Sequence, residues 1–255
     1  MKSRPRPTGQ PRIEPKLQAR RIEVARHQGR RRLRTVLVIL VLVAVVVGAF
    51  VAVQSPLLDV DQVVVTGAPH TGAAAIRRAS GIPVGQAMAS VDAGTAAARL
   101  ERLPWVEQAT VARSWPGTVR ITVVERSPLA IIGEGADAAL VDAHGRVLGP
   151  AAKEHLPVIG GSPVNAGAEV PSQRRLVLAV LAGMPPKLRK EVAGAHATAS
   201  GIALTLTDGI RVDWGSISQS TAKNDALTVL LKQADRPTIA TIDVSVPRAA
   251  TITRR

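Results

Sequence analysis

The 255-residue sequence contains no cysteine and no tyrosine, and its aromatic residues are limited to Phe50, Trp105, Trp115 and Trp214. The absence of cysteine excludes disulfides and thiolate chemistry. With so few aromatic side chains, a core must be built from Val, Leu, Ile and Ala, which favours sheets and small helices. Because 46% of the residues are apolar, we expect globular folding into one large domain or two modest ones.

Most of the positive charge lies in one N-terminal arm. Residues 1–34 hold 12 Lys and Arg against two Glu, a balance of +10, which leaves +4 of the total +14 for residues 35–255. Four prolines interrupt the first 15 residues, so we expect disorder there, with a helix allowed only from Lys16 to Arg34. No base-reading motif accompanies the charge, which favours contact with anionic lipid headgroups and argues against nucleic acid as a partner.

A long uncharged run follows the arm. Residues 35–53, TVLVILVLVAVVVGAFVAV, contain no charged side chain, and 19 residues of helix nearly span the ~30 Å hydrocarbon core of a membrane. Arginines precede this run, whereas Asp59 and Asp61 follow it, which predicts a cytoplasmic N-terminus. A signal peptide cleaved near Ala49 is the alternative, but the long basic lead favours an uncleaved single-pass anchor.

Residues 57–126 show the pattern of a small domain with the order β-α-α-β-β. A strand with Val63 and Val65 on one face precedes a helix that we expect Thr71 to cap and Gly81 to end. A second helix is expected between a cap at Ser90 or Asp92 and Pro104. Two strands then form a hairpin around a Trp-Pro-Gly-Thr turn, with Val119, Ile121 and Val123 inward.

Residues 127–253 predict a mixed sheet with helices packed on one side. Short strands are expected at residues 138–141 and 146–148, LPVIGG is expected to mark a further edge, and Asp208-Gly209 predicts a hairpin between residues 202–206 and 210–213. One helix over residues 171–183 should turn Leu176, Val180 and Leu181 inward, and another, over residues 219–234, should bury Leu227, Leu230 and Leu231. Final strands are expected at residues 238–246 and 249–253. The fold class is therefore α+β.

No catalytic constellation survives its sequence context, so we expect no enzyme activity, no cofactor and no metal. The stretch from Gly133 to Ala138 matches a loose dinucleotide-binding pattern, but a turn at residues 142–145 arrives before a helix can form. The five histidines lack metal-binding spacing. Asp208 and Asp213 flank a hairpin and could be imagined as paired carboxylates for glycan hydrolysis, but turn chemistry explains Asp208 more simply. Lys223, near the start of the last helix, has two interpretations of equal weight, namely a functional role and a solvated or locally bonded side chain.

The residues that carry a resemblance are LPWVEQATVARSWPGTVRITVVERSPLA, residues 103–130, and the later IDVSVP, residues 242–247. Together with the basic arm and the single span, they closely resemble the FtsQ/DivIB family of bacterial cell-division proteins. The most specific part is Trp115-Pro116 followed by Glu125, Arg126 and Pro128. The resemblance implies a POTRA domain at residues 57–126, with Glu-Arg-Ser-Pro as the hinge to the family's β domain.

The resemblance also implies a function and partners. The chain would be a divisome scaffold at the division septum, with its C-terminal domains outside the cytoplasm, and would bind FtsB/DivIC-like and FtsL-like single-pass proteins that act on the septal synthase FtsW/FtsI. FtsB would be held by strand addition at the last strand. The residues that match this site are Arg248, Ala249, Ala250, Thr251 and Ile252, supported by Ile239, Ile242, Asp243 and Val244.

Two other functions remain as alternatives. A cell-wall glycan-processing enzyme would need a convergent carboxylate pair, which the sequence does not show. A POTRA-bearing transport component would normally carry tandem POTRA repeats, and none is visible.

Overall fold

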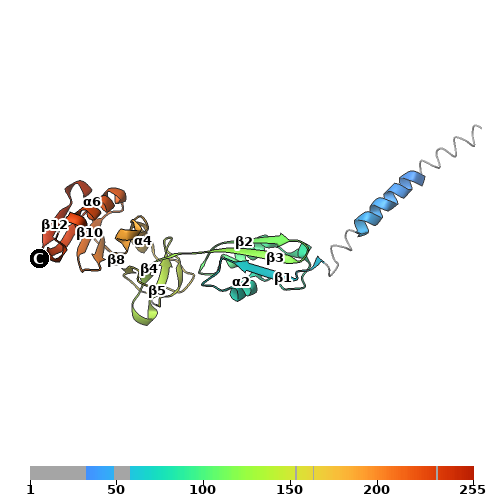
Figure 1. The fold of residues 1–255 in the computed structure, drawn as a ribbon, viewed down its shortest axis with the longest axis horizontal. Coiled ribbons are helices and arrows are strands. Elements are labelled where there is room, and N and C mark those ends of the chain that lie inside the picture. Colours follow the sequence, from blue (N-terminus) through green and yellow to red (C-terminus); the bar gives the residue numbers. More distant parts are fainter. Residues whose placement is uncertain (1–32, 49–57, 153, 163, 234) are drawn as a thin grey trace, which may run out of the picture. The chain divides into compact units, whose positions relative to one another are not determined.

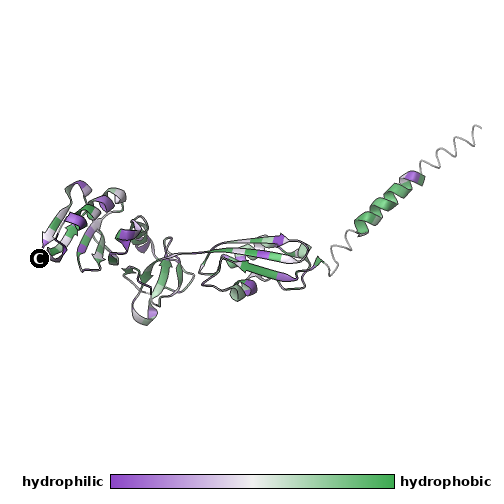
Figure 2. Ribbon diagram, viewed as in Figure 1, coloured by the Kyte–Doolittle hydropathy of each residue, from purple (hydrophilic) through white to green (hydrophobic). Residues whose placement is uncertain are grey.

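The computed structural model describes residues 33–48, 58–152, 154–162, 164–233 and 235–255. The chain divides into two compact units, residues 1–59 and 60–255. In the first unit, residues 33–48 form a helix whose side chains are predominantly hydrophobic (Figure 2). Among the described residues, no helix combines the length and the apolar character needed to cross a membrane. Most of the basic arm and residues 49–53 of the expected span lie outside the described residues.

The second unit begins with a three-stranded sheet in the order β1-β3-β2 (Figure 1). Strand β1 (Gln62–Thr66) pairs in parallel with β3 (Thr118–Glu125), which pairs antiparallel with β2 (Val106–Ser114). The alternation along β3 buries Val119, Ile121 and Val123, as the sequence predicted. These side chains pack with residues of the neighbouring helices into one hydrophobic cluster.

Two helices, α2 (Ala73–Ser80) and α3 (Ala93–Leu100), complete this part, with a 3-10 turn η2 (Met88–Ser90) between them. Gly81 ends α2 in the left-handed conformation, φ 68°, as expected. Thr71 does not cap α2, because Gly72 occupies that position and the Thr71 N–H donates to Glu125. Asp92 caps α3 by accepting from the N–H of Thr95, and Ser90 belongs to η2.

The remaining strands form a single nine-stranded mixed sheet in the order β12-β11-β10-β9-β8-β7-β4-β5-β6. Most neighbouring strands are antiparallel, but β4 with β7, β7 with β8, and β10 with β11 are parallel pairs. The strands are β4 (Pro128–Ile132), β5 (Ala139–Asp142), β6 (Val147–Pro150), β7 (Val158–Ile159), β8 (Val192–Thr198), β9 (Gly201–Leu206), β10 (Arg211–Gly215), β11 (Ile239–Asp243) and β12 (Thr251–Arg254).

The short strand β7 lies inside this sheet and corrects one expectation. The LPVIGG stretch was expected to mark an edge, yet Val158 and Ile159 pair with β4 on one side and β8 on the other. Only two residues of β7 pair on each side, and the longer ladders belong to its neighbours, which pair with β5 and β9. The antiparallel hairpin of β9 and β10 around Gly209, φ 83°, agrees with the Asp-Gly prediction.

Three helices accompany the large sheet, namely α4 (Ser172–Ala182), α5 (Pro186–Arg189) and α6 (Ser220–Gln233). Helix α4 buries Val180 and Leu181 as predicted, but Leu176 is 47% exposed because Val177 and Leu178 occupy the inward positions instead. Helix α6 buries Leu227 and Leu231, while Leu230 is half-buried. It also buries Lys223 and Asn224, which its apolar periodicity does not predict.

The last two strands are shorter than expected. Strand β11 ends at Asp243, whose carboxylate accepts a 2.8 Å hydrogen bond from the N–H of Ser245 and turns the chain away from the sheet. A 3-10 turn η5 (Pro247–Ala249) then occupies the start of the expected final strand. Two further 3-10 turns, η3 (Gly135–Asp137) and η4 (Arg236–Thr238), precede β5 and β11.

Candidate partner-binding strand edge

The C-terminal strand β12 forms one end of the nine-stranded sheet. It pairs with β11 in antiparallel register, with Ile252 opposite Ile242 and Thr251 opposite Asp243. In the described residues no other strand pairs with β12, so its second side is an open edge. An open edge presents unpaired N–H and C=O groups to which a strand of another chain can add.

The direction of each N–H in β12 follows from one hydrogen bond beyond its end. The backbone N–H of Arg255 donates to the carbonyl of Thr238 at 2.9 Å, so it points toward the β11 side. Because N–H groups alternate in direction along a strand, those of Thr253 and Thr251 also point inward. The N–H groups of Ile252 and Arg254 therefore point outward and are available to a partner.

Of the five residues expected to form the edge, only two lie in β12. Arg248 and Ala249 lie in η5 and Ala250 precedes the strand, so the expectation that the strand starts at Ala249 is wrong. The reason is Pro247, which starts the 3-10 turn and delays extended pairing until Thr251. Thr251 and Ile252 do lie in β12, which continues through Arg254.

The four supporting residues lie in or directly after β11, on the inner side of β12. Ile239, Ile242 and Val244 are completely buried in the main hydrophobic cluster, so their side chains cannot reach a partner on the outside. Asp243 is half-buried and stabilises the turn to Ser245. Ile252 packs against the same cluster, whereas Thr251 and Thr253 are exposed. These contacts hold β12 to the body of the sheet.

The surface around the edge is basic. Arg248, Arg254 and Arg255 are all exposed, and they lie before, within and after β12. Next to η5, residues 219–222 at the start of α6 and residues 246–248 line a groove of about 770 Å³. Val246, on this groove, is 59% exposed. A partner strand placed on β12 would meet positive charge at both ends and apolar surface beside η5.

Lys223 is the most unusual side chain near this edge, since it is a lysine with 1% exposure. Its Nζ donates to the carbonyls of Trp214, at 2.9 Å, and Ser216, at 2.8 Å, and it lies 5.8 Å from the centre of the Trp214 ring. Burial lowers the pKa of Lys223, and the charge of Asp243 acts in the opposite direction. Lys223 thus fastens α6 to the end of β10, the strand beside β11.

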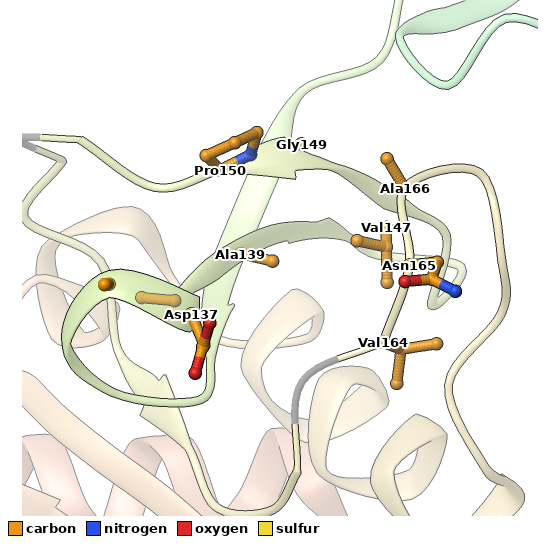
Figure 3. A pocket seen from close by; sticks show the side chains of 10 residues that line it. Asp137, Ala139, Val147, Gly149, Pro150, Val164, Asn165 and Ala166 are labelled. Atoms are coloured by element: carbon orange, nitrogen blue, oxygen red, sulfur yellow. The ribbon is translucent and has the colours of Figure 1, made fainter.

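A cavity of about 330 Å³ lies at the other end of the sheet, between η3, β5, β6 and residues 164–166 (Figure 3). Its polar lining side chains are Asp137 and Asn165, and the others are apolar. After Gly133 the chain forms the short 3-10 turn η3 and then β5. The helix that a dinucleotide site needs therefore does not form there. The cavity brings together no acid, base and nucleophile.

The carboxylates considered for catalysis are each held by arginine. Arg236 contacts both Asp208 and Glu191, and Arg211 donates to Asp213 at 3.0 Å. The Oδ1 atom of Asp208 also accepts from the N–H of Ile210, as expected for a turn. In the part of the chain that the structure describes, no group of three His, Cys, Asp or Glu residues is arranged to hold a metal ion.

The three tryptophans have three different surroundings. Trp214 is completely buried, and Trp105 stacks on His70 with ring centres 4.4 Å apart. Trp115, in the β2–β3 turn, is 53% exposed. Of the histidines, His27 lies outside the described residues, His70 contacts Glu125 at 2.9 Å, and His144, His155 and His196 are exposed.

Comparisons with known proteins agree with this architecture. A family model described as POTRA domain, FtsQ-type, matches residues 58–126, and one described as cell division protein FtsQ/DivIB, C-terminal, matches residues 130–245. The chain is 34% identical to the cell division protein FtsQ of Streptomyces bingchenggensis over 77% of this chain and 76% of that protein. It is 32% identical to the Streptomyces coelicolor protein of that name, over 86% of this chain and 87% of the relative. It is 34% identical to the cell division protein FtsQ of Mycobacteroides abscessus, over 86% of this chain and 70% of that protein. The chain therefore belongs to the FtsQ/DivIB family of cell division proteins.

Proposed function

We propose that this chain is a non-enzymatic scaffold of the divisome that captures other single-pass division proteins by strand addition at β12. The observation that carries the proposal is the open outer edge of β12, with the N–H groups of Ile252 and Arg254 directed away from β11. The resemblance to FtsQ proteins supports an FtsB/DivIC-like partner, with FtsL beside it. Through them the chain would regulate septal peptidoglycan synthesis by FtsW and FtsI.

The proposal includes a membrane anchor at residues 35–53, which places residues 1–34 in the cytoplasm and the POTRA domain, 57–126, and β domain, 127–253, outside it. The uncharged run and the arginines before it support this arrangement. The basic arm would then lie against anionic lipid headgroups on the cytoplasmic side. An anchored scaffold is confined to the membrane surface, where its single-pass partners also lie.

The decisive experiment removes one outward N–H from β12. Ile252→Pro eliminates a donor that a partner strand would use, so capture of the extracytoplasmic part of the FtsB-like partner by the purified full chain should be lost. Ile252→Val is the matched control, because it keeps the N–H and the β-branched shape, and it should bind like the parent. Arg254→Pro removes the second outward donor and should also abolish capture.

Proline at position 251 tests the direction assigned to the backbone N–H groups of β12. The N–H of Thr251 points inward, so Thr251→Pro should damage the pairing of β12 with β11 and loosen the strand itself. Circular dichroism and hydrogen exchange of β11 separate that damage from simple loss of a partner contact. Capture that is unchanged in both Ile252→Pro and Arg254→Pro would place the partner contact away from this edge.

A further inference from the structure

The chain enters the three-stranded sheet between two loops, at the start of β1. The N–H of Val60 donates to the carbonyl of Gln86, and the N–H of Gly85 donates to the carbonyl of Val60, both at 2.8 Å. On the other side, the N–H of Asp61 donates to the carbonyl of Gly117 at 2.7 Å. We call these two loops, residues 84–86 and 115–117, together with Val60 and Asp61, the proximal pole.

Two large apolar side chains are exposed at the proximal pole. Val84 is 69% exposed and Trp115 is 53% exposed, and each is within two residues of a backbone group bonded to the incoming chain. The other two tryptophans are satisfied within the fold, since Trp214 is buried and Trp105 stacks on His70. Trp115 and Val84 lie in the two loops that bond to the incoming chain, and no described part of the chain covers these two side chains.

The charge of the proximal pole favours apolar contact over electrostatic contact. Asp61 is exposed on one side, and Arg113, at the end of β2, is exposed on the other, with its Nη1 3.5 Å from the carbonyl of Ala89. These opposite charges leave no surplus of positive charge near Trp115. A surface of this kind does not select anionic ligands, but it does gain free energy when Trp and Val side chains leave water.

The length of chain before the proximal pole identifies what can cover it. The proposed anchor ends at Val53, and covalent geometry limits the seven steps from Val53 to Val60 to about 25 Å. The polar layer of a membrane is about 5–8 Å thick on each side of the hydrocarbon core. The proximal pole is therefore within reach of the lipid surface, and tryptophan is enriched at that depth because its ring is amphipathic.

We infer that the proximal pole rests in the lipid headgroup layer, with the side chains of Trp115 and Val84 inserted into the boundary between headgroups and acyl chains. This inference rests on the proposed anchor and adds a second, independent contact with the same bilayer. The anchor and the pole together fix the three-stranded unit at two points.

The absence of cysteine from the chain makes a direct test possible. Val84→Cys introduces a single site for a nitroxide label, and Val124→Cys is the matched control, because Val124 is 50% exposed on the same domain and lies near the far end of β3. The full chain is reconstituted into phosphatidylcholine vesicles and isolated by flotation. Relaxation by a water-soluble nickel chelate and by oxygen then reports the depth of each label.

The expected result is nickel accessibility several-fold lower, and oxygen accessibility higher, at residue 84 than at residue 124. Adding Trp115→Ser to the Val84→Cys chain should return residue 84 to water-like values. Because the pole has no surplus positive charge, the result should be the same in vesicles that contain phosphatidylglycerol and at high salt.

Three outcomes would overturn the inference. If the chain floats with the vesicles but residues 84 and 124 are equally accessible to nickel, the anchor stands and the pole does not touch lipid. If the chain does not float, the anchor proposal fails and the inference fails with it. If residue 84 is shielded from both relaxants and its spectrum shows spin–spin broadening, a second copy of the chain covers the pole instead of lipid.

Discussion

The ammonium group of Lys223 donates a 2.9 Å hydrogen bond to the backbone carbonyl of Trp214, and neither residue has more than 1% of its surface exposed. A buried lysine costs free energy unless its charge and its N–H groups are satisfied. Here the Lys223 ammonium group donates to two carbonyls and lies over a tryptophan ring, and all three acceptors belong to residues 214–216 at the end of β10. The contact joins a helix to the part of the sheet that supports β11 and β12.

Replacing this lysine should destabilise the large sheet. Lys223→Met keeps the length of the side chain but leaves the Trp214 and Ser216 carbonyls without their donor, and unsatisfied buried groups cost about 1–3 kcal/mol. The free energy of unfolding from urea titration should fall by that amount. Lys232→Met, at an exposed position in the last turn of the same helix, is the control and should change little. Equal unfolding free energies in the two variants would mean that Lys223 is not a structural contact.

Glu125 should make the stability of the POTRA domain, residues 58–126, sensitive to acid. Burial by itself raises the pKa of Glu125, but hydrogen bonds from Thr71 and His70 outweigh it and hold the pKa below its ordinary value of 4.5. A lowered pKa in the folded state stabilises the fold above pH 4.5, and this contribution is lost as the pH falls through the folded-state pKa.

The test compares the parent with Glu125→Gln. At pH 7 the variant should be less stable by about 1.5–3 kcal/mol, the range for hydrogen bonds to a charged group. At pH 3 the difference should shrink, because protonation removes the charge from the parent as well. Glu107→Gln, on the exposed side of β2, should show no such pH dependence. A constant difference between pH 7 and pH 3 would contradict the assignment.

The arginines at the end of β12 should make partner capture dependent on salt. If the partner segment is acidic, Arg254→Gln together with Arg255→Gln should weaken binding at low ionic strength, by about 0.2–1 kcal/mol for each exposed charge pair. The difference from the parent should disappear at high salt, where such pairs are screened. Titration calorimetry at two salt concentrations measures both effects, with Arg77→Gln, exposed on α2, as the control. An unchanged affinity at low salt would remove these arginines from the contact.

The carboxylates flanking the β9–β10 hairpin should not be required for division. Asp208→Asn weakens the contact with Arg236, and Asp213→Asn weakens the contact with Arg211, so each should cost some stability without removing a reaction step. Cells depleted of the parent protein should divide when either variant is supplied. Failure to divide with a variant that is folded and present at the parent level would favour the enzyme alternative.

Local sequence patterns determined much of this architecture. Alternation along residues 119–123 predicted the buried face of β3, Asp-Gly predicted the hairpin at Gly209, and the periodicity of residues 220–233 predicted α6. These features depend on interactions between residues that are close in the chain, so a single sequence contains the information. The motif around Trp115 and Glu125 was sufficient to indicate the family that the comparisons then identified.

Tertiary structure decided the features that join distant segments. Only the paired strands place the two-residue β7 inside the sheet and leave β12 at its end, because strand order depends on contacts between residues far apart in sequence. Likewise, the sequence gives Lys223 two equal interpretations, and its burial follows from the position of Trp214 nine residues earlier in another element. The exposure of Trp115 is of the same kind, since a turn residue is covered or uncovered by whatever the rest of the fold brings to it.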